Sequence, residues 1–357
     1  MAPPRTGTIT EGKPRLVLVD GSGYIFRAFH ALPPMTRPGD GVPVNAVFGF
    51  TQMIANLLTK DTPSHIAVVF DAGRVTFRND IYPDYKAHRP DPPPELVPQF
   101  ALIREATDAL GVARLESDGF EADDLIASYA RAFLAEVPGG EVVVVSSDKD
   151  LMQLIRPGVV LLDPMKQKPI GEAEVLEKFG VPPGKVVEVQ ALAGDSTDNV
   201  PGVPGIGVKT AAQLITEYGD LETLLARAGE IKQPKRRESL IEHAEKARIS
   251  RRLVLLDDAA PLPAPIGTLV AKPAPEGRLA AFLRAQGFRS ILHRLGLEAA
   301  NGDAAQAAAR AMRRVADGGA AGGVPVAAAD GAPGGALGGA AGGAAGGAPD
   351  AAPFGPY

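Results

Sequence analysis

The sequence predicts an α/β domain with a mainly parallel sheet, followed by a helical region and a low-complexity tail. Three observations support this prediction. Short runs of β-branched residues alternate with segments of helical period in the first half of the chain, which is typical of parallel sheets covered by helices. After about residue 164 the strand patterns stop and helical patterns continue. Of the last 40 residues, 28 are Gly or Ala and five are Pro. Because such a segment buries too little apolar surface to fold, residues 299–357 are expected to be disordered.

Each element follows from its local pattern. Strands are predicted where short apolar runs occur, at residues 15–20, 65–71, 112–115 and 141–147. The helices between them are predicted at about residues 46–58, 95–110 and 121–136. Later helices are predicted at about residues 172–179, 184–193, 208–218, 221–226 and 237–256. We therefore assign residues 14–170 to the α/β domain and residues 171–298 to the helical region.

Composition excludes several classes of chemistry. The 357 residues contain no cysteine, which excludes disulfides, thiolate metal sites and cysteine nucleophiles, and the five histidines make a structural zinc site unexpected. Any catalytic metal would be a hard ion bound through oxygen. The polar, Pro-rich N-terminus does not resemble a signal peptide, and no apolar run approaches the roughly 18 residues of a membrane span. We therefore expect a cytoplasmic protein without a membrane partner. The net charge of −5 does not exclude nucleic acid, since binding needs only a local basic patch.

Acidic residues form the main candidate site. Three predicted strands end at or beside Asp20, Asp71 and Asp148. Because ligands gather beyond the carboxyl ends of parallel strands, we expect these carboxylates at one edge of the sheet. Six further acids occur in tight groups: Glu121, Asp123, Asp124, Asp150, Asp195 and Asp198.

Each acid alone has an ordinary explanation in helix-dipole or turn chemistry. As a group they are harder to explain, since two like charges 4 Å apart repel by about 4 kcal/mol at an effective dielectric near 20. Divalent cations such as Mg²⁺ or Mn²⁺ prefer carboxylate ligands and would resolve that repulsion. Two such ions roughly 3.5–4 Å apart can drive an in-line displacement at phosphorus. The chain contains no P-loop, GxSxG or HExxH motif, so the acids predict a metal-dependent nuclease.

Three further segments suit nucleic acid. Glycines 202, 205 and 207, followed by Lys209 and Thr210, could bring backbone N–H groups close to a phosphate, although Gly-Pro turns also join helices without binding anything. Residues 232–252 carry eight Lys or Arg against three Glu, which fits a duplex-backbone stripe or a solvated helix face. Residues 77–90 mix aromatics with cations, which suits single strands or a surface loop anchored by tyrosines.

Four motifs resemble the 5′-nuclease domain of bacterial DNA polymerase I, which belongs to the flap endonuclease family. They are GFEADD (119–124), SDKDL (147–151), GDSTDNVPGVPGIG (194–207) and YKAHR (85–89). The likeness extends from about residue 15 to residue 297. It implies a PIN-like α/β domain joined to a helix-three-turn-helix DNA-binding region, with a helical arch at about residues 77–100 and a helix-hairpin-helix motif at residues 194–215.

The resemblance also implies roles for individual residues. Asp20, Asp71, Glu121, Asp123 and Asp124 would surround the first metal, and Asp148, Asp150, Asp195 and Asp198 the second. The expected cofactors are two Mg²⁺ or Mn²⁺ ions, with a K⁺ ion as a further candidate at the hairpin. Catalytic roles are expected for Lys86, Arg89, Asp148 and Asp195, with Lys86 stabilising charge on the scissile phosphate. The expected DNA-binding residues are Arg78, Tyr85, Lys86, Gly202, Gly205, Gly207, Lys209 and Thr210.

The chain departs from the family pattern after the nuclease domain. In polymerase I, proofreading-like and polymerase domains come next, whereas here the nuclease-like residues lead only into the Gly/Ala tail. We therefore expect a stand-alone nuclease or a fragment, without polymerase activity.

The main hypothesis is a structure-selective 5′-3′ exonuclease and flap endonuclease acting on DNA 5′ ends, flaps or nicks in replication and repair. A DNA polymerase acting in trans is a candidate partner, and the expected location is the nucleoid. Two alternatives stay open: an RNA-directed nuclease of the same fold, and a non-catalytic DNA-binding scaffold.

Overall fold

The computed structural model describes residues 12–297, so the predicted tail at 299–357 lies outside the described residues. The described part contains one six-stranded sheet of order β3-β2-β1-β4-β5-β6. All neighbouring strands are parallel except β5 and β6. The strands are β1 (Arg15–Asp20), β2 (His65–Val69), β3 (Ala113–Leu115), β4 (Glu141–Val145), β5 (Val159–Asp163) and β6 (Lys168–Ile170). The predicted mainly parallel α/β fold is confirmed.

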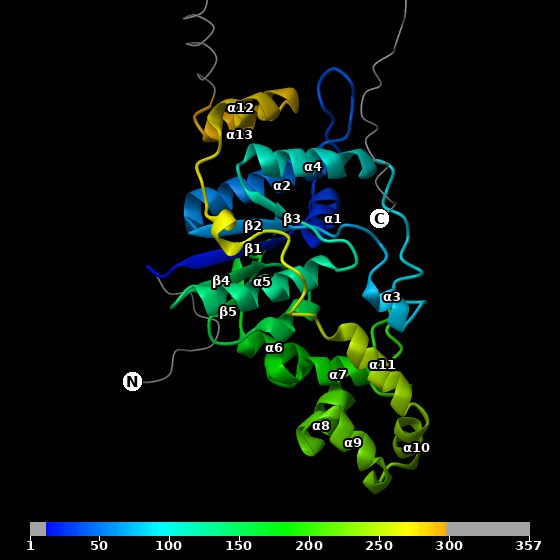
Figure 1. The fold of residues 1–357 in the computed structure, drawn as a ribbon. Coiled ribbons are helices and arrows are strands. Elements are labelled where there is room, and N and C mark those ends of the chain that lie inside the picture. The colour runs from blue at the N-terminus through cyan, green and yellow to red at the C-terminus, as the bar shows by residue number, and fades with distance from the viewer. Residues whose placement is uncertain (1–11, 298–357) are drawn as a thin grey trace, which may run out of the picture.

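Helices cover both faces of the sheet (Figure 1). The helices of this region are α1 (Gly21–Ala31), α2 (Asn45–Asn56), α3 (Phe77–Ile81), α4 (Val97–Ala109) and α5 (Ala122–Glu136), with a π-helical turn η1 (Leu57–Asp61) after α2 and a 3₁₀ turn η2 (Asp150–Leu154) after β4. Alternate residues of the central strands enter two different cores. Leu16 and Leu18 pack with α5, whereas Val17 and Val19 pack with α2 and α4. Burial on both faces explains why these strands are continuously apolar.

Helix α1 was not predicted, because no loop separates it from β1. Asp20 is both the last residue of β1 and the N-cap of α1. Gly21 lies so close to Phe70 that a Cβ atom there would be 2.6 Å from that ring. Strands β5 and β6 were also not predicted; they extend the sheet beyond β4.

The helical region begins after β6. It contains α6 (Glu172–Phe179), η3 (Pro183–Lys185), α7 (Val186–Ala193), α8 (Val208–Tyr218), α9 (Leu221–Ala226), η4 (Ala228–Glu230), α10 (Pro234–Glu242) and α11 (Ala244–Val254). The single helix predicted at residues 237–256 is wrong, since His243 has φ −109° and ψ 22° and separates α10 from α11. In Figure 1, α7 to α11 form a lobe on one side of the sheet.

The last helices do not belong to that lobe. After the short turn η5 (Ile266–Leu269), α12 (Glu276–Ala285) and α13 (Arg289–Arg294) return to the opposite side of the molecule and lie over α4 (Figure 1). Their apolar residues Phe282, Leu283 and Ile291 join the core formed by α2 and α4. Within the range predicted as one helical region, residues 171–298, the last two helices thus pack on the α/β domain and not in the lobe. No helix within residues 12–297 is long and apolar enough to cross a bilayer.

Candidate metal centre

Three aspartates mark one edge of the sheet. Asp20 ends β1, Asp71 follows β2 by two residues, and Asp148 follows β4 by three. Strands β2, β1 and β4 are direct neighbours and parallel, so their carboxyl ends lie side by side. We call this edge, with Asp20, Asp71 and Asp148, the carboxyl edge. The topology thus places these three acids as expected.

The backbone around Asp20 holds its carboxylate in place. Oδ1 accepts a hydrogen bond from the Gly23 amide at 2.8 Å, and Oδ2 accepts one from the Ser146 hydroxyl at 2.8 Å. A Cβ atom at Gly23 would lie 2.3 Å from Oδ2 of Asp20, so any other residue there would displace this carboxylate. Sequence reasoning missed Gly23 and Ser146, although the GSG triplet directly after Asp20 is a usable signal.

Helix α5 brings a second row of acids to the carboxyl edge. Its N-cap is Glu121, and Asp123 lies in its first turn. The start of α5 is fixed to β2 because Oδ1 of Asp71 accepts a hydrogen bond from the Ala122 amide at 2.8 Å. Arg104 supports the same place from α4, with its guanidinium over the Phe70 ring and within 3.4 Å of the Asp71 carbonyl. Sequence reasoning did not single out Arg104.

The remaining acids come from η2 and from the loop after α7. The carboxylate of Asp150 accepts a hydrogen bond from the side-chain Nε2 of Gln190 at 2.5 Å. Asp195 accepts one from the Thr197 backbone at 2.8 Å. Asp198, three residues further on, is buried.

Eight of the nine predicted acids line two adjoining cavities of about 500 and 300 Å³. The larger is lined by Asp20, Asp71, Glu121, Asp123, Asp148, Asp150 and Asp198. The smaller shares four of these acids and adds Asp195. We call these eight residues the acid cluster. The two groups predicted for separate ions therefore lie next to each other.

Cations already contact three members of the acid cluster. Lys86 Nζ lies 2.7 Å from Oε1 of Glu121 and 3.8 Å from Asp198, while Arg89 pairs with Asp198 and Lys149 with Asp195. Within residues 12–297, no ion pair reaches Asp20, Asp123, Asp148 or Asp150. In the same described part, no three His, Asp or Glu side chains are oriented to share one ion. The cluster is gathered, but several of its carboxylates are engaged by these cations or by donors such as Gly23, Ser146 and Gln190.

Burial and mutual repulsion change the acidity of the cluster. Burial, opposed by hydrogen bonds from Gly23 and Ser146, raises the pKa of Asp20 to about 6. Burial and the neighbouring Asp148 raise the pKa of Asp150 to about 6 and the pKa of Asp123 well above its usual range. Burial would also raise the pKa of Glu121, but Lys86 and Arg78 outweigh it and lower that pKa. Three acids without a cation partner, Asp20, Asp123 and Asp150, therefore resist ionisation, which is the electrostatic condition that a bound cation relieves.

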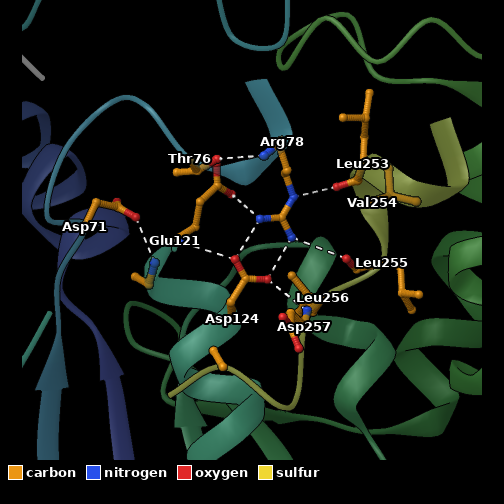
Figure 2. A network of polar contacts seen from close by, with 12 residues as sticks. Asp71, Thr76, Arg78, Glu121, Asp124, Leu253, Val254, Leu255, Leu256 and Asp257 are labelled. Carbon is orange, nitrogen blue, oxygen red and sulfur yellow. Dashed lines mark hydrogen bonds and ion pairs between the residues drawn. The ribbon is translucent and has the colours of Figure 1, made fainter. Parts of the chain in front are cut away.

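Asp124 and Arg78 are corrections to the expected site. Asp124 lines neither cavity; it is fully buried, and its two oxygens accept hydrogen bonds from Nη1 and Nη2 of Arg78 at 2.7 and 2.8 Å. Figure 2 shows the two groups facing each other. Arg78 is only 1% exposed, so it cannot contact DNA as expected. Both errors have one cause: the sequence shows the charges but not that they neutralise each other in the interior.

The predicted arch is docked over the cluster. The Lys86 amide donates to the Asp198 carbonyl at 3.0 Å, and Asn199 donates to the Asp84 carbonyl at 2.7 Å. Lys86 has a φ of 56°, a left-handed conformation that costs a lysine about 1 kcal/mol or more. Tyr85 is buried with its hydroxyl 3.3 Å from Glu121. The tyrosine therefore supports Glu121, and no face of it is open to a DNA base here.

The glycine hairpin divides into a buried and an exposed half. Gly202 packs against Gly194, where a Cβ atom would meet backbone at 2.5 Å, and its amide donates to Ser250. It is a packing residue, which corrects its expected contact with DNA. Gly205, Gly207 and Lys209 are exposed, and Thr210 is half-buried at the start of α8. Only this second half is available to a phosphate.

Comparison with known proteins agrees with this geometry. Residues 15–180 match the family model described as "5′-3′ exonuclease, N-terminal resolvase-like domain", and residues 181–276 match "5′-3′ exonuclease, C-terminal SAM fold". The chain belongs to the 5′-3′ exonuclease family. The predicted family resemblance is thereby confirmed.

Relatives and solved structures of the 5′-3′ exonuclease family add detail. DNA polymerase I of Rhizobium leguminosarum is 54% identical over 296 residues, which are 81% of this chain and 29% of that protein. DNA polymerase I of Geobacillus stearothermophilus is 39% identical over 82% of this chain and 33% of that protein. The chain thus spans about a third of the length of these relatives.

Among solved structures, the T5 5′-exonuclease with bound zinc has a TM-score of 0.59 at 22% identity, covering 76% of this chain and 97% of that one. The bacteriophage T5 D15 flap endonuclease in a complex with DNA and metal ions also has a TM-score of 0.59, at 21% identity, covering 76% and 99%. These two likenesses show a shared fold.

Proposed function

We propose that this chain is a structure-selective 5′-3′ exonuclease and flap endonuclease that hydrolyses DNA phosphodiester bonds with two divalent ions. One observation carries the proposal. Aspartates at the carboxyl ends of three adjacent parallel strands meet acids from α5, η2 and the loop after α7 in two joined cavities. Family membership supports the same reaction. Such a protein would work on chromosomal DNA in the nucleoid, with a polymerase as its partner in cis or in trans.

The donor set fits hard cations. It offers only carboxylate oxygens, and four of these acids have no cation partner in the described residues. Asp20, Asp71, Glu121 and Asp123 would hold one ion, with Asp148, Asp150 and Asp195 around the other; Mg²⁺ and Mn²⁺ both prefer such ligands. When bound, the ions would supply the positive charge that attracts the phosphodiester and stabilises its developing negative charge.

Residues of the docked arch orient the substrate in this proposal. Lys86 and Arg89 contact Glu121 and Asp198 across the mouth of the cavities. A scissile phosphate would replace these carboxylates as their partner, so that Lys86 donates to a phosphate oxygen. The exposed hairpin residues Gly205, Gly207 and Lys209, with Thr210, would bind the duplex backbone at the start of α8, and hairpin carbonyls would hold K⁺.

The decisive assay uses three 5′-labelled substrates: a DNA flap, a nicked duplex and a matched RNA flap. We expect release of 5′ products from both DNA substrates in Mg²⁺, with none in EDTA and much less from RNA. Duplex binding without turnover in Mg²⁺ or Mn²⁺ would instead support a scaffold, and preferred cleavage of the RNA flap would support an RNA-directed nuclease.

The role of Lys86 has its own test. Lys86→Ala should slow single-turnover flap cleavage by roughly 10²-fold, as expected for a lost electrostatic contact to the transition state. Duplex affinity, measured in Ca²⁺ by fluorescence anisotropy, should change much less. Equal losses in rate and affinity would contradict a transition-state role.

A further inference from the structure

The segment that leaves α11 lies along the acid cluster. The strap, as we call residues 253–257, consists of the last two residues of α11 and the three that follow. It carries the chain past α3 and the start of α5 (Figures 1 and 2), and Gln153 of η2 also contacts it. Helix α11 packs on α7 and also on α3. The strap is therefore the segment by which the chain leaves the lobe, and it passes the acids as it does so.

Arg78 donates hydrogen bonds to one side of the strap. Its Nε donates to the Leu253 carbonyl at 2.7 Å, and Nη2 lies 3.3 Å from the Leu255 carbonyl. The same guanidinium binds both oxygens of Asp124, and Nη1 lies 3.6 Å from Oε2 of Glu121 (Figure 2). A guanidinium has five N–H donors, and here each has an acceptor nearby. A lysine could not reproduce this fork.

Asp124 completes the same connection. Its Oδ1 also accepts from the Asp257 amide at 2.9 Å, and its Oδ2 from the Glu121 amide at 3.1 Å. The buried Arg78–Asp124 ion pair therefore contacts the strap at three residues. The same pair contacts the backbone amide and the side chain of Glu121. The position of Glu121 depends on whether the strap is docked.

Gln153 grips the other side of the strap. Its Nε2 donates to the carbonyls of Val254 and Asp150, both at 2.9 Å, and its Oε1 accepts from the Leu256 amide at 3.1 Å. The contacts alternate along the strap, with residues 253 and 255 on Arg78 and residues 254 and 256 on Gln153. The strap lies between a residue that holds Glu121 and one that holds Asp150.

We infer that Arg78 and Gln153 are positioning residues that tie Glu121 and Asp150, members of the acid cluster, to the docking of the helical lobe. This inference rests on the proposed function. Without Arg78, Oε2 of Glu121 keeps the Tyr85 hydroxyl at 3.3 Å while Oε1 remains on Lys86. The carboxylate would then be positioned by residues of the arch and no longer by the strap. Supporting residues of this kind typically change metal affinity by roughly 10- to 100-fold.

The test compares stability with metal affinity in the full chain. Arg78→Lys keeps the charge but loses the fork, and Gln153→Met keeps length but loses the amide. Ser128→Ala is the matched control, because Ser128 is buried on α5 and binds the strap's Asp257 carbonyl and the Ala260 amide without touching the acid cluster. Thermal unfolding gives Tm, and calorimetric titration with Mg²⁺ at about pH 7.5 without DNA gives the dissociation constant.

We expect all three variants to lower Tm, while only Arg78→Lys and Gln153→Met weaken Mg²⁺ binding, by about tenfold. High Mg²⁺ should partly restore flap cleavage by these two. If Arg78→Lys does not fold, Gln153→Met alone decides. Mg²⁺ affinities equal to that of Ser128→Ala would overturn the inference and leave the proposed function intact. Failure of the wild-type chain to bind or use Mg²⁺ would overturn both.

Discussion

The carboxyl edge and the Arg78–Asp124 pair are close in the molecule but treat charge in opposite ways. At the edge, Asp20 and Asp123 are packed among other carboxylates, and burial with repulsion raises their pKa values. A few residues away, Asp124 is fully buried and ionically paired, with both oxygens engaged by Arg78 and two backbone amides. The clustered carboxylates at the edge destabilise the folded protein until a cation neutralises them. The charge of Asp124 is already neutralised by Arg78 within the protein. Of the adjacent acids in one motif, Asp124 therefore serves structure, whereas Asp123 stays without a cation and suits the metal-binding role proposed above.

The largest expected effect is at the edge. Asp148→Asn should reduce single-turnover flap cleavage at least a thousandfold, equivalent to about 4 kcal/mol in the barrier, because it removes a charged ligand. Stability should change by no more than about 0.5 kcal/mol, since Asp148 is exposed and an Asn oxygen can still accept from the Asp150 amide. Circular dichroism melting beside the cleavage assay checks both. Near-normal cleavage would remove Asp148 from the metal centre.

Asp124→Asn should show the reverse pattern. Removing one partner of a buried ion pair typically costs about 3–5 kcal/mol, and Arg78 would be left buried without its counter-charge. Urea unfolding measures this loss. If Asp124→Asn lowered the free energy of unfolding by less than about 1 kcal/mol, Asp124 would not be a structural acid, and its role would not differ from that of Asp123.

The pH dependence of stability tests the unpaired acids. The pKa of Asp20 is about 6 in the folded chain against an ordinary value of 3.8, so the folded state binds the proton more tightly than the unfolded one. The contribution of protonated Asp20 to the free energy of unfolding is present in full below about pH 4 and is lost as pH rises through 6. For a shift of this size the loss is about 2–3 kcal/mol.

Metal-free wild-type protein should therefore lose more stability between pH 4 and 7 than Asp20→Asn, as measured by urea unfolding at each pH. Mg²⁺ should restore stability at pH 7 but have little effect at pH 5. Identical pH profiles for the two proteins would show that Asp20 is not strained in the metal-free state.

Lys209 provides the smallest expected effect, at an exposed site that belongs to neither region. Lys209→Ala should weaken duplex binding by less than tenfold and lower the slope of log affinity against log salt by about 1, with the fold unaffected. Anisotropy titrations at several salt concentrations measure it. An unchanged salt slope would mean that this hairpin cation does not meet a phosphate.

Periodicity and topology made much of this molecule predictable. Alternating strands and helices indicated a parallel sheet, and the aspartates at the ends of three strands indicated one edge, because parallel strands share their direction. Helix α1 was missed because its only start signal, Asp20, is also the last residue of a strand. The role of Arg78 was missed because a sequence pattern of cations and aromatics does not reveal whether the arginine is buried. A buried guanidinium and a DNA-binding one have the same neighbours in sequence. Gly202 was misassigned because a glycine serves close packing and phosphate contact equally well.

The direct passage from β1 into α1 has a consequence for how this centre can vary. Asp20 is held on one side by Gly23 and on the other by Ser146, with no linker residue between strand and helix. One inserted residue here would rotate α1 by about 100° relative to the sheet and take the carboxylate's amide donor with it. A change of chain length at this junction is therefore expected to harm the position of the Asp20 carboxylate more than a substitution does. An insertion at this junction should therefore disrupt the metal centre even if every acidic residue is retained.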